Sequence, residues 1–313
     1  MEKVLTVATR GGKLAIAQTG IVINALKKIY PDIQIEIKKV TTKGDRDRRT
    51  ALWNLKETGF FTSQVEDVLL TKQADFAVHS LKDMPTQLRQ GLTIAAVCDR
   101  QFVEDCLIAA KPISSIAELP NTAKIGTSSL RRVAQLKRLR ADLRLEPIRG
   151  NVTTRIKKLE EACPRAGGGQ FDAIILARAG VERLGLSDKI SFCFDPRQFI
   201  PAPAQGALAV QTRTDDAETT KLISAIDDQV AHVATFAERQ VLAAMQCGCH
   251  APIGVFAEVV GDDIQICAFI SDLEGKNFIG RSITGPITDV FKLAEELAND
   301  ILSSGGQEIL QDI

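Results

Sequence analysis

A lysine and an aspartate stand together where a short apolar run of the sequence ends. Lys82 and Asp83 lie within His79–Pro85, and the preceding run, Asp75–Val78, has the composition of a buried strand. Ligand sites in α/β sheets form where strands emerge into loops, and Pro85 prevents a helix from starting at once. We expect the lysine to hold an anionic substrate while the carboxylate handles protons. From these residues alone, the alternative is an exposed ion pair of little energetic value.

The sequence from Lys124 to Lys158 is strongly basic, with eleven basic residues and two acidic ones. Residues 127–129, Thr-Ser-Ser, stand at the predicted end of a strand and the start of a helix. Backbone N–H groups, hydroxyls and the positive end of the helix dipole favour an anion there. Arg131 and Arg132 follow in the first helical turn, which is the unfavourable end for cations, so we expect an anion between them.

A second turn-to-helix signal lies at residues 149–155, with Arg149 and Arg155 at its two ends. Thr153 or Thr154 is expected to cap this helix while the two arginines point at a common ligand. Nucleic acid is the alternative partner, but the chain has one Trp and one Tyr, and no aromatic side chains interleave the basic residues to stack on bases. A small polycarboxylate fits better. The remaining basic residues of the preceding helix are interpreted as a solvated face: Lys137, Arg138 and Arg140.

Two cysteines and a histidine form a third cluster at residues 247–250. A metal site needs about four ligands, this cluster offers fewer, and His79 and His232 are isolated, so no metal is predicted. A disulfide between Cys247 and Cys249 would be strained. Because the loop sequence Gly-Cys-X-X-Pro exposes a thiol instead of burying it, a nucleophile or a covalent attachment point is expected over a structural cysteine.

The elements that must position these residues alternate between strand and helix. This βαβ rhythm predicts a mostly parallel sheet covered by helices. Strands are expected at residues 4–8, 33–37, 75–78, 124–126, 143–147 and 171–177, and helices at 14–29, 60–70, 129–140 and 156–162. After residue 216 the pattern changes to a smaller α+β unit, with a helix around 236–245, strands near 253–260 and 264–271, and a helix over 290–302.

Composition narrows the class of protein. Of 313 residues, 45% are hydrophobic and 25% charged, and 39 basic side chains balance 39 acidic ones, so no net charge attracts nucleic acid or membranes. No apolar run approaches the ~20 residues of a membrane span, and the N-terminal run is too short for a signal peptide. Seven mostly isolated cysteines suit reduced thiols. We predict a cytoplasmic protein, and a monomer because no apolar interface helix is left over.

Taken in order, these motifs resemble the porphobilinogen deaminase (hydroxymethylbilane synthase) family along nearly the whole chain. The blocks that carry the resemblance are Ala8–Arg10, His79–Thr86, Ile125–Arg132, Arg149–Arg155, Leu176–Leu186, Pro201–Val210, Ala237–Arg239, and Gly248-Cys249 with Pro252-Ile253-Gly254. The resemblance implies an α/β fold of two periplasmic-binding-protein-like domains with mixed sheets plus a smaller C-terminal α+β domain. Domain 1 would comprise residues 1–99 and 199–217, domain 2 residues 100–198, and domain 3 residues 218–313, with a double hinge between the first two.

The resemblance also implies the chemistry. Four porphobilinogens are joined head to tail into hydroxymethylbilane with release of ammonia, on a dipyrromethane cofactor attached by a thioether to Cys249. Each pyrrole carries an acetate and a propionate, so the growing chain requires arginines. Asp83 would stabilise the positive pyrrole nitrogen left when ammonia departs, and relay protons. The implied cofactor-binding residues are Ser80, Lys82, Thr127, Ser128, Ser129, Arg131 and Arg132, and the implied substrate-binding residues are Arg10, Arg149, Arg155 and Arg183.

The sequence departs from the family pattern at a few positions. Gly12 stands where a serine is usual, Thr58 where a lysine is usual, and Ser63 where some members have a second lysine. Ala204 replaces a common glycine. An active enzyme is still predicted, because the catalytic aspartate, the principal arginines and the cofactor cysteine are kept. The alternatives are a non-catalytic anion-binding protein, an inactive paralogue of the same fold and, against the neutral net charge, an RNA-binding protein.

Overall fold

The computed structural model describes residues 4–42, 62–161, 170–246 and 251–312. Within these residues the chain divides into two compact units. The first unit holds the described residues up to 101 together with 205–233, and the second holds those within 102–204 and from 234 onward. The first unit is therefore discontinuous in sequence, because the chain leaves it after residue 101 and returns at residue 205.

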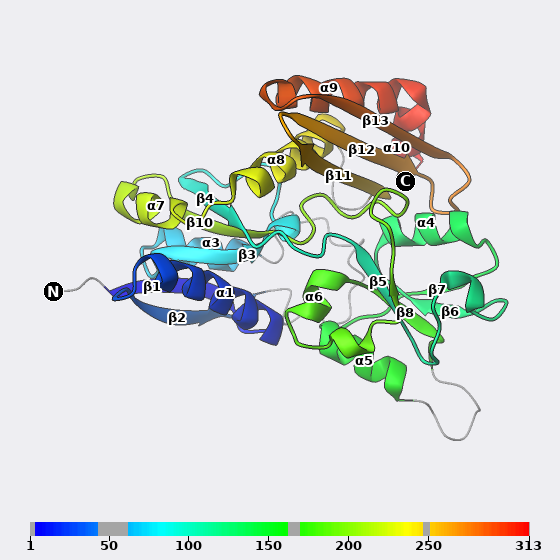
Figure 1. Cartoon of the computed structure of the whole chain (residues 1–313), viewed down its shortest axis with the longest axis horizontal. Coiled ribbons are helices and arrows are strands. Elements are labelled where there is room, and N and C mark those ends of the chain that lie inside the picture. Colours follow the sequence, from blue (N-terminus) through cyan, green and yellow to red (C-terminus); the bar gives the residue numbers. More distant parts are fainter. Residues whose placement is uncertain (1–3, 43–61, 162–169, 247–250, 313) are drawn as a thin grey trace. The chain divides into compact units, whose positions relative to one another are not determined.

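A five-stranded mixed sheet forms the centre of the first unit, as far as its residues are described. Its strands are β1 (Val4–Arg10), β2 (Gln34–Val40), β3 (Phe76–Ser80), β4 (Leu92–Cys98) and β10 (Leu208–Arg213). They run in the order β2-β1-β3-β10-β4 (Figure 1). β1 is parallel to β2 and β3, whereas β10 is antiparallel to both of its neighbours. The expectation of a mostly parallel sheet is wrong at β10, because this strand enters the sheet from a later part of the chain.

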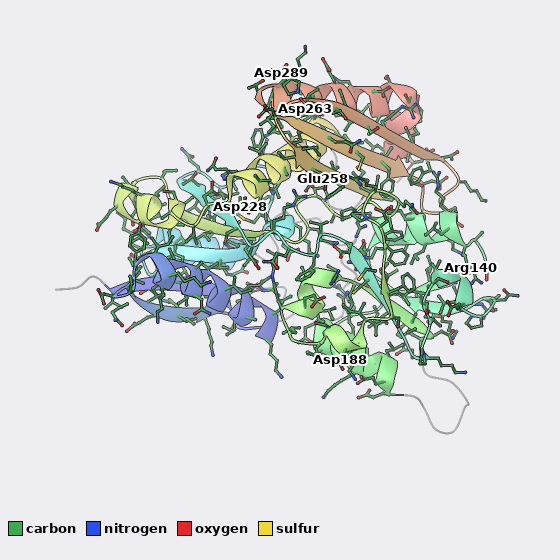
Figure 2. The ribbon with its side chains drawn as sticks, viewed as in Figure 1. Arg140, Asp188, Asp228, Glu258, Asp263 and Asp289 are labelled. Carbon is green, nitrogen blue, oxygen red and sulfur yellow. The ribbon has the colours of Figure 1, made fainter. Side chains whose placement is uncertain are left out.

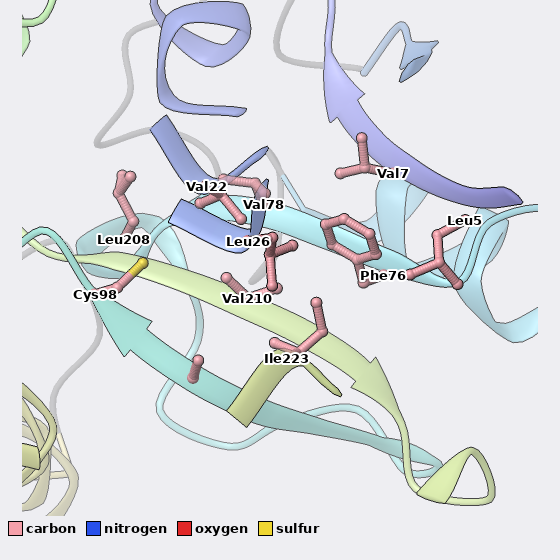
Figure 3. Packing of buried hydrophobic residues seen from close by; sticks show 11 residues of the cluster. Leu5, Val7, Val22, Leu26, Phe76, Val78, Cys98, Leu208, Val210 and Ile223 are labelled. Atoms are coloured by element: carbon pink, nitrogen blue, oxygen red, sulfur yellow. The ribbon is translucent and has the colours of Figure 1, made fainter. Parts of the chain in front are cut away.

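Helices cover both faces of this sheet. Successive residues of a strand point to opposite sides, so each strand contributes side chains to both faces. The described helices are α1 (Lys13–Ile29), α3 (Ser63–Leu70) and α7 (Ala217–Ser224). On one face Val22 of α1 and Ile223 of α7 belong to one core with Phe76 (Figure 3). On the other face Val65 of α3 packs with Ala77. β3 is consequently buried on both sides, and its end is held in place.

The second unit begins with another mixed sheet. Its described strands are β5 (Asp105–Ala109), β6 (Lys124–Gly126), β7 (Arg144–Glu146), β8 (Ala173–Ala177) and β9 (Phe192–Cys193). They run in the order β7-β6-β8-β5-β9, with β6 parallel to β7 and β8, and β5 antiparallel to β8 and β9. The helices α4 (Leu130–Leu139), α5 (Val152–Glu160) and α6 (Arg178–Glu182) follow β6, β7 and β8. Three parallel strands thus lead into helices at one edge of the sheet, the usual place for a ligand site.

The C-terminal part of the second unit is α+β, as predicted. β11 (Ile253–Val260), β12 (Asp263–Ser271) and β13 (Phe278–Pro286) form an antiparallel meander. α9 (Val290–Ile301) packs against β12 and β13 and buries Leu293 and Leu297. Two further helices are α8 (Gln229–Ala244) and α10 (Gln307–Gln311). Within the described part of the chain, no helix is both long enough and apolar enough to cross a bilayer.

Candidate active site

Asp83 lies where β3 emerges from the sheet of the first unit, as the sequence predicted. β3 ends at Ser80, and Leu81–Asp83 form one turn of 3-10 helix. The turn is anchored because Leu81 is buried and its backbone N–H donates to the Ala207 carbonyl at 3.1 Å. The Asp83 side chain is exposed. An anchored backbone therefore presents this carboxylate to solvent or to a ligand.

The neighbours of Asp83 are oriented by side chains from other elements. Lys82 Nζ donates to Oε1 of the buried Gln205 at 3.3 Å. On the α1 side, Gln18 Nε2 donates to Ser80 Oγ at 2.9 Å. Both predicted cofactor-binding residues of this turn thus have protein partners that fix their direction.

Arg10 reaches the same edge of the sheet from β1. β1 and β3 are parallel and pair Val7 with Phe76 and Ala8 with Ala77, so Arg10 ends its strand at the level of His79. Burial lowers the pKa of His79 to about 4, a hydrogen bond with Gln211 opposes this, and the charge of Arg10 adds to it. His79 is therefore neutral at pH 7, and among the described residues Arg10 and Lys82 bring basic side chains to this edge of the sheet.

In the second unit, residues 127–129 connect β6 to α4, as predicted. The Ser128 hydroxyl donates to the Ile148 carbonyl at 2.7 Å and accepts from the Ile148 N–H at 3.1 Å. Thr127 Oγ1 accepts from the Ser129 N–H at 3.3 Å, and Ser129 is the N-cap residue of α4 without a side-chain cap hydrogen bond. Ser128 therefore ties the end of β6 to the segment after β7 and brings the two predicted anion-binding turns together.

The anion expected between Arg131 and Arg132 is present in the protein itself. Asp105 Oδ2 accepts from Arg131 Nη2 at 2.7 Å, and Oδ1 accepts from Arg132 Nη2 at 2.8 Å. Burial alone would raise the pKa of the Asp105 carboxyl, but the two guanidinium groups outweigh it and hold the pKa far below its usual range. Asp105 was missed in the sequence, although a carboxylate opening an otherwise apolar strand run is a signal that it has a buried cationic partner.

Both arginines are also held by backbone carbonyls. Arg131 Nη1 donates to Ile200 O at 2.7 Å, and Arg132 Nη1 donates to Ile175 O at 3.1 Å. Among the described residues, Arg132 Nε is buried and finds no acceptor. A buried guanidinium nitrogen without an acceptor carries a desolvation penalty, so this atom is a donor suited to an anionic ligand.

Two further arginines surround Arg132. Burial, followed by the positive charges of Arg132 and Arg149, lowers the pKa of Arg155 to about 10. Arg155 Nε donates to the Gly150 carbonyl at 2.8 Å. These three arginines therefore share a region of positive potential at the helix-bearing edge of the second sheet, the property that a polycarboxylate site requires.

The cap of α5 differs from the prediction. Asn151, and neither Thr153 nor Thr154, is the N-cap residue: its Oδ1 accepts from the Thr154 N–H at 2.8 Å. Both threonine hydroxyls donate to the same oxygen, at 2.8 and 2.7 Å. The prediction of a threonine cap was wrong because Asn151 stands at the position with extended backbone that a cap needs, and both threonines follow inside the helix.

Arg183 follows α6, at the end of the chain path that leaves β8, and is half-buried. Since β8 and β6 are parallel neighbours, Arg183 belongs to the same edge of the sheet as residues 127–129. Arg178, in the first turn of α6, instead pairs with Glu104 at 2.6 Å and Glu182 at 2.8 Å. It therefore has carboxylate partners inside the unit.

The basic residues at the other end of α4 have structural contacts. Arg140, labelled in Figure 2, pairs with Asp142 at 2.6 Å. Lys137 Nζ donates to the Leu143 carbonyl at 2.8 Å, and the Arg138 guanidinium lies 3.8 Å from the ring centroid of Phe278. The interpretation as a solvated face holds for the exposed Arg138, whereas Lys137 and Arg140 are partly buried and donate to backbone carbonyls.

Several sequence features fall outside the described residues or take another place. Cys249, Cys247 and Thr58 lie outside them. Gly12 is the N-cap residue of α1, and Ser63 is the first residue of α3. Ala204 has a left-handed backbone with φ of 61°, and its N–H donates to Glu238 Oε2 at 2.6 Å. The alanine thus occupies a conformation that favours the glycine common at this position.

Comparison with known proteins decides the family. The family model described as porphobilinogen deaminase, dipyromethane cofactor binding domain, matches residues 5–221, and that of the porphobilinogen deaminase C-terminal domain matches residues 233–303. The chain belongs to the porphobilinogen deaminase family. It is 40% identical over 313 residues to the porphobilinogen deaminase of Carboxydothermus hydrogenoformans, covering 100% of this chain and 98% of the relative. It is 38% identical to that of Natranaerobius thermophilus, over 99% of this chain and 98% of the relative.

The reaction follows from membership of the porphobilinogen deaminase family. The chain is a transferase of tetrapyrrole (haem) biosynthesis that joins four porphobilinogens into hydroxymethylbilane with release of ammonia, and its cofactor is dipyrromethane.

Among solved structures, the methionine-binding protein MetQ aligns with a TM-score of 0.43 at 14% identity, covering 75% of this chain and 93% of MetQ.

Proposed function

We propose that the porphobilinogen deaminase family member described here uses Asp83 as its catalytic carboxylate and the arginines of the second unit to hold the carboxylates of the growing chain. The carrying observation is the buried Arg132 Nε, which has no acceptor among the described residues. Its neighbour Arg155 has a pKa lowered to about 10, chiefly by burial and then by the positive charges of Arg132 and Arg149. Every pyrrole added brings an acetate and a propionate, so a site for this chain needs cations in excess of internal carboxylates. Arg10 and Arg183 extend the set of substrate-binding residues.

The residues present fit the dipyrromethane cofactor. Thr127, Ser128, Ser129, Arg131 and Arg132, with Ser80 and Lys82, would bind its carboxylates, and Cys249 would attach it. The support from the structure is the buried Arg132 Nε, which has no acceptor among the described residues. When bound, the cofactor supplies the free pyrrole position on which the polymer is built. The protein's own part is to neutralise carboxylates and to hold them in one orientation.

Asp83 has two proposed tasks, which are to stabilise a positive charge on the substrate and to relay a proton. Departure of ammonia from porphobilinogen leaves positive charge that extends to the pyrrole nitrogen, and a fixed carboxylate beside that nitrogen stabilises it. The same carboxylate relays the proton lost when the new carbon–carbon bond forms. Its place on an anchored turn supports this role, because the Leu81 N–H to Ala207 carbonyl bond limits how far the carboxylate moves.

Intact mass tests the attachment. The wild type is expected to exceed its sequence mass by two deaminated porphobilinogen units, and Cys249→Ser is expected to lose this excess. Cys247→Ser, two positions away, is the matched control and should keep it. An unmodified wild type after incubation with porphobilinogen would overturn the proposal of a covalently primed enzyme, and loss of the excess in Cys247→Ser alone would move the attachment to Cys247.

We also propose a three-domain division, with boundaries near residues 99, 199 and 217, and a cytoplasmic monomer that binds no nucleic acid. The separate sheets of the second unit support a division into a second and a third domain. The balanced charge supports the absence of nucleic-acid binding, and the mostly isolated cysteines support a cytoplasmic location. Light scattering at micromolar concentration checks the oligomeric state: a mass of one chain is expected, and a mass of two chains would replace the monomer by a dimer.

A further inference from the structure

The deepest charge cluster in the second unit consists of one carboxylate and two guanidinium groups. Asp105 is fully buried, and the side chains of Arg131 and Arg132 are 5% and 8% exposed. Each carboxylate oxygen takes a different arginine, at 2.7 and 2.8 Å. Because isolated buried charges are very unfavourable, this arrangement is stable only while all its members are present.

The geometry leaves each guanidinium little freedom. Nη2 of each arginine is bound to Asp105, and Nη1 is bound to a backbone carbonyl, Ile200 for Arg131 and Ile175 for Arg132. Two bonds from different nitrogens fix the plane of a guanidinium as well as its position. Arg132 Nε is the atom left without an acceptor among the described residues.

The charges also have a consequence. One carboxylate against two guanidinium groups leaves one net positive charge in the buried cluster, next to Arg155, whose pKa responds to Arg132. Asp105 thus permits two adjacent arginines to be buried together without neutralising both. A preorganised cation of this kind binds a carboxylate without the entropy loss of fixing two long side chains.

We propose that Asp105 is a positioning residue: it orients Arg131 and Arg132 before ligand arrives and so sets how well the enzyme captures carboxylates of cofactor and substrate. This inference rests on the proposed role of the two arginines. Both Asp105 oxygens accept from the arginines, so its proposed effect on ligand binding is exerted through them.

The test uses two variants of the full chain and a matched control. Asp105→Asn keeps the shape and removes the charge, and Asp105→Glu keeps the charge and displaces it by one methylene. Asp142→Asn is the control, because it removes the carboxylate from the exposed Arg140–Asp142 pair at the other end of α4. For each protein we would measure the fraction carrying cofactor by intact mass, and KM and kcat of the cofactor-bearing fraction.

Both Asp105 variants are expected to lower the cofactor-bearing fraction or raise KM by at least about tenfold, with a smaller change in kcat, because breaking a buried charge pair is strongly unfavourable. Asp142→Asn is expected to match the wild type. A folded Asp105 variant with wild-type loading and KM would overturn the proposal. Arg132→Lys distinguishes failure of this inference from failure of the proposed function. Normal cofactor loading in Arg132→Lys would remove the proposed role of Arg132 in binding the cofactor.

If neither Asp105 variant folds, a measurement on protein that keeps Asp105 still tests the proposal. In Cys249→Ser, labelled with ¹⁵N and ¹³C at arginine, NMR reports rotation of each guanidinium, with signals assigned by Arg→Lys variants. Slow rotation at Arg131 and Arg132, and fast rotation at Arg144, which is exposed at the start of β7, are expected before any cofactor is attached. Fast rotation at both buried arginines would contradict positioning by Asp105.

Discussion

Gln135 binds both backbone groups of Ile200. Its Oε1 accepts from the Ile200 N–H at 2.7 Å, and its Nε2 donates to the Ile200 carbonyl at 3.0 Å. The same carbonyl accepts from Arg131, and the next one, of Pro201, accepts from the Val255 N–H at 3.1 Å. One α4 side chain thus fixes Ile200, and the neighbouring Pro201 carbonyl binds the start of β11.

Gln135→Leu is expected to destabilise the protein by about 1–3 kcal/mol, because it leaves a buried N–H without an acceptor and removes one donor from the carbonyl. Denaturant unfolding followed by circular dichroism measures this. Gln34→Leu, at an exposed position of β2, is the control and is expected to change stability little. Equal stability of Gln135→Leu and the wild type would mean that Arg131 and water satisfy Ile200.

Ala204→Gly tests the strained backbone where the family commonly has glycine. Relief of a left-handed alanine offsets the flexibility that glycine adds to the unfolded chain and the loss of a buried methyl. We expect a net change within about 0.5 kcal/mol, against a loss of about 1 kcal/mol or more for Ala173→Gly in β8, where no strain is relieved. Similar losses in the two variants would show that φ at Ala204 carries no strain.

His79 predicts a pH dependence of the first unit. Its folded pKa, about 4, lies below the ordinary value of 6.5, so the unfolded chain binds more protons between these values. Stability is therefore highest above pH 7 and falls by up to about 1.4 kcal/mol per unit as pH drops toward 4. Hydrogen exchange of β3 and β10 at several pH values measures this. His79→Gln should flatten the dependence, and an unchanged dependence in this variant would show that His79 is not its source.

Cys106 and Cys193 are direct partners across the antiparallel pair of β5 and β9. Their neighbours Asp105 and Phe194 are hydrogen-bonded, so the cysteines occupy the closer type of cross-strand pair, within the range that a disulfide spans. Burial raises the pKa of both thiols, so a thiol oxidant should link them slowly. Peptide mapping should find this bond, and Cys193→Ser should prevent it. Pairing of Cys106 with Cys267 instead would contradict the register.

Asp83→Asn is expected to lower kcat by at least about a hundredfold at unchanged thermal stability, since the carboxylate is exposed and its proposed role is to stabilise charge in the transition state. The measured quantity is turnover per cofactor-bearing molecule, with loading determined by mass. Asp67→Asn removes a carboxylate from an exposed pair with Arg89 and serves as the control. Normal turnover of the Asp83 variant would remove this residue from the mechanism.

Periodicity predicted the helices that bury a stripe of side chains and the strands with continuous apolar runs. α1, α4 and α9 begin and end within a residue or two of their predicted bounds. β13 was missed because Phe278–Pro286 contains two glycines and is mostly exposed, so its apolar pattern is weak. The direction of β10 was missed because it depends on where the chain re-enters the sheet, which no local pattern encodes.

For the site, the sequence predicted positions better than partners. The strand-end location of Asp83 and the helix-start location of Arg131 and Arg132 follow from short-range signals. Asp105 lies 26 residues before Arg131, and only the pairing of β5 with β8 carries it to them. Long-range partners of this kind are set by tertiary structure, which also explains why the expected anion proved to be internal.

The place of β10 in the first sheet sets an order for folding during synthesis. β10 lies between β3 and β4, yet the ribosome makes it only after all of residues 102–204. When β4 emerges, β3 has no neighbour on that side, whereas the strands β5 to β9 can pair as soon as they are made. The sheet encoded first is thus completed after the sheet encoded second, and the nascent chain carries an open strand edge in the meantime.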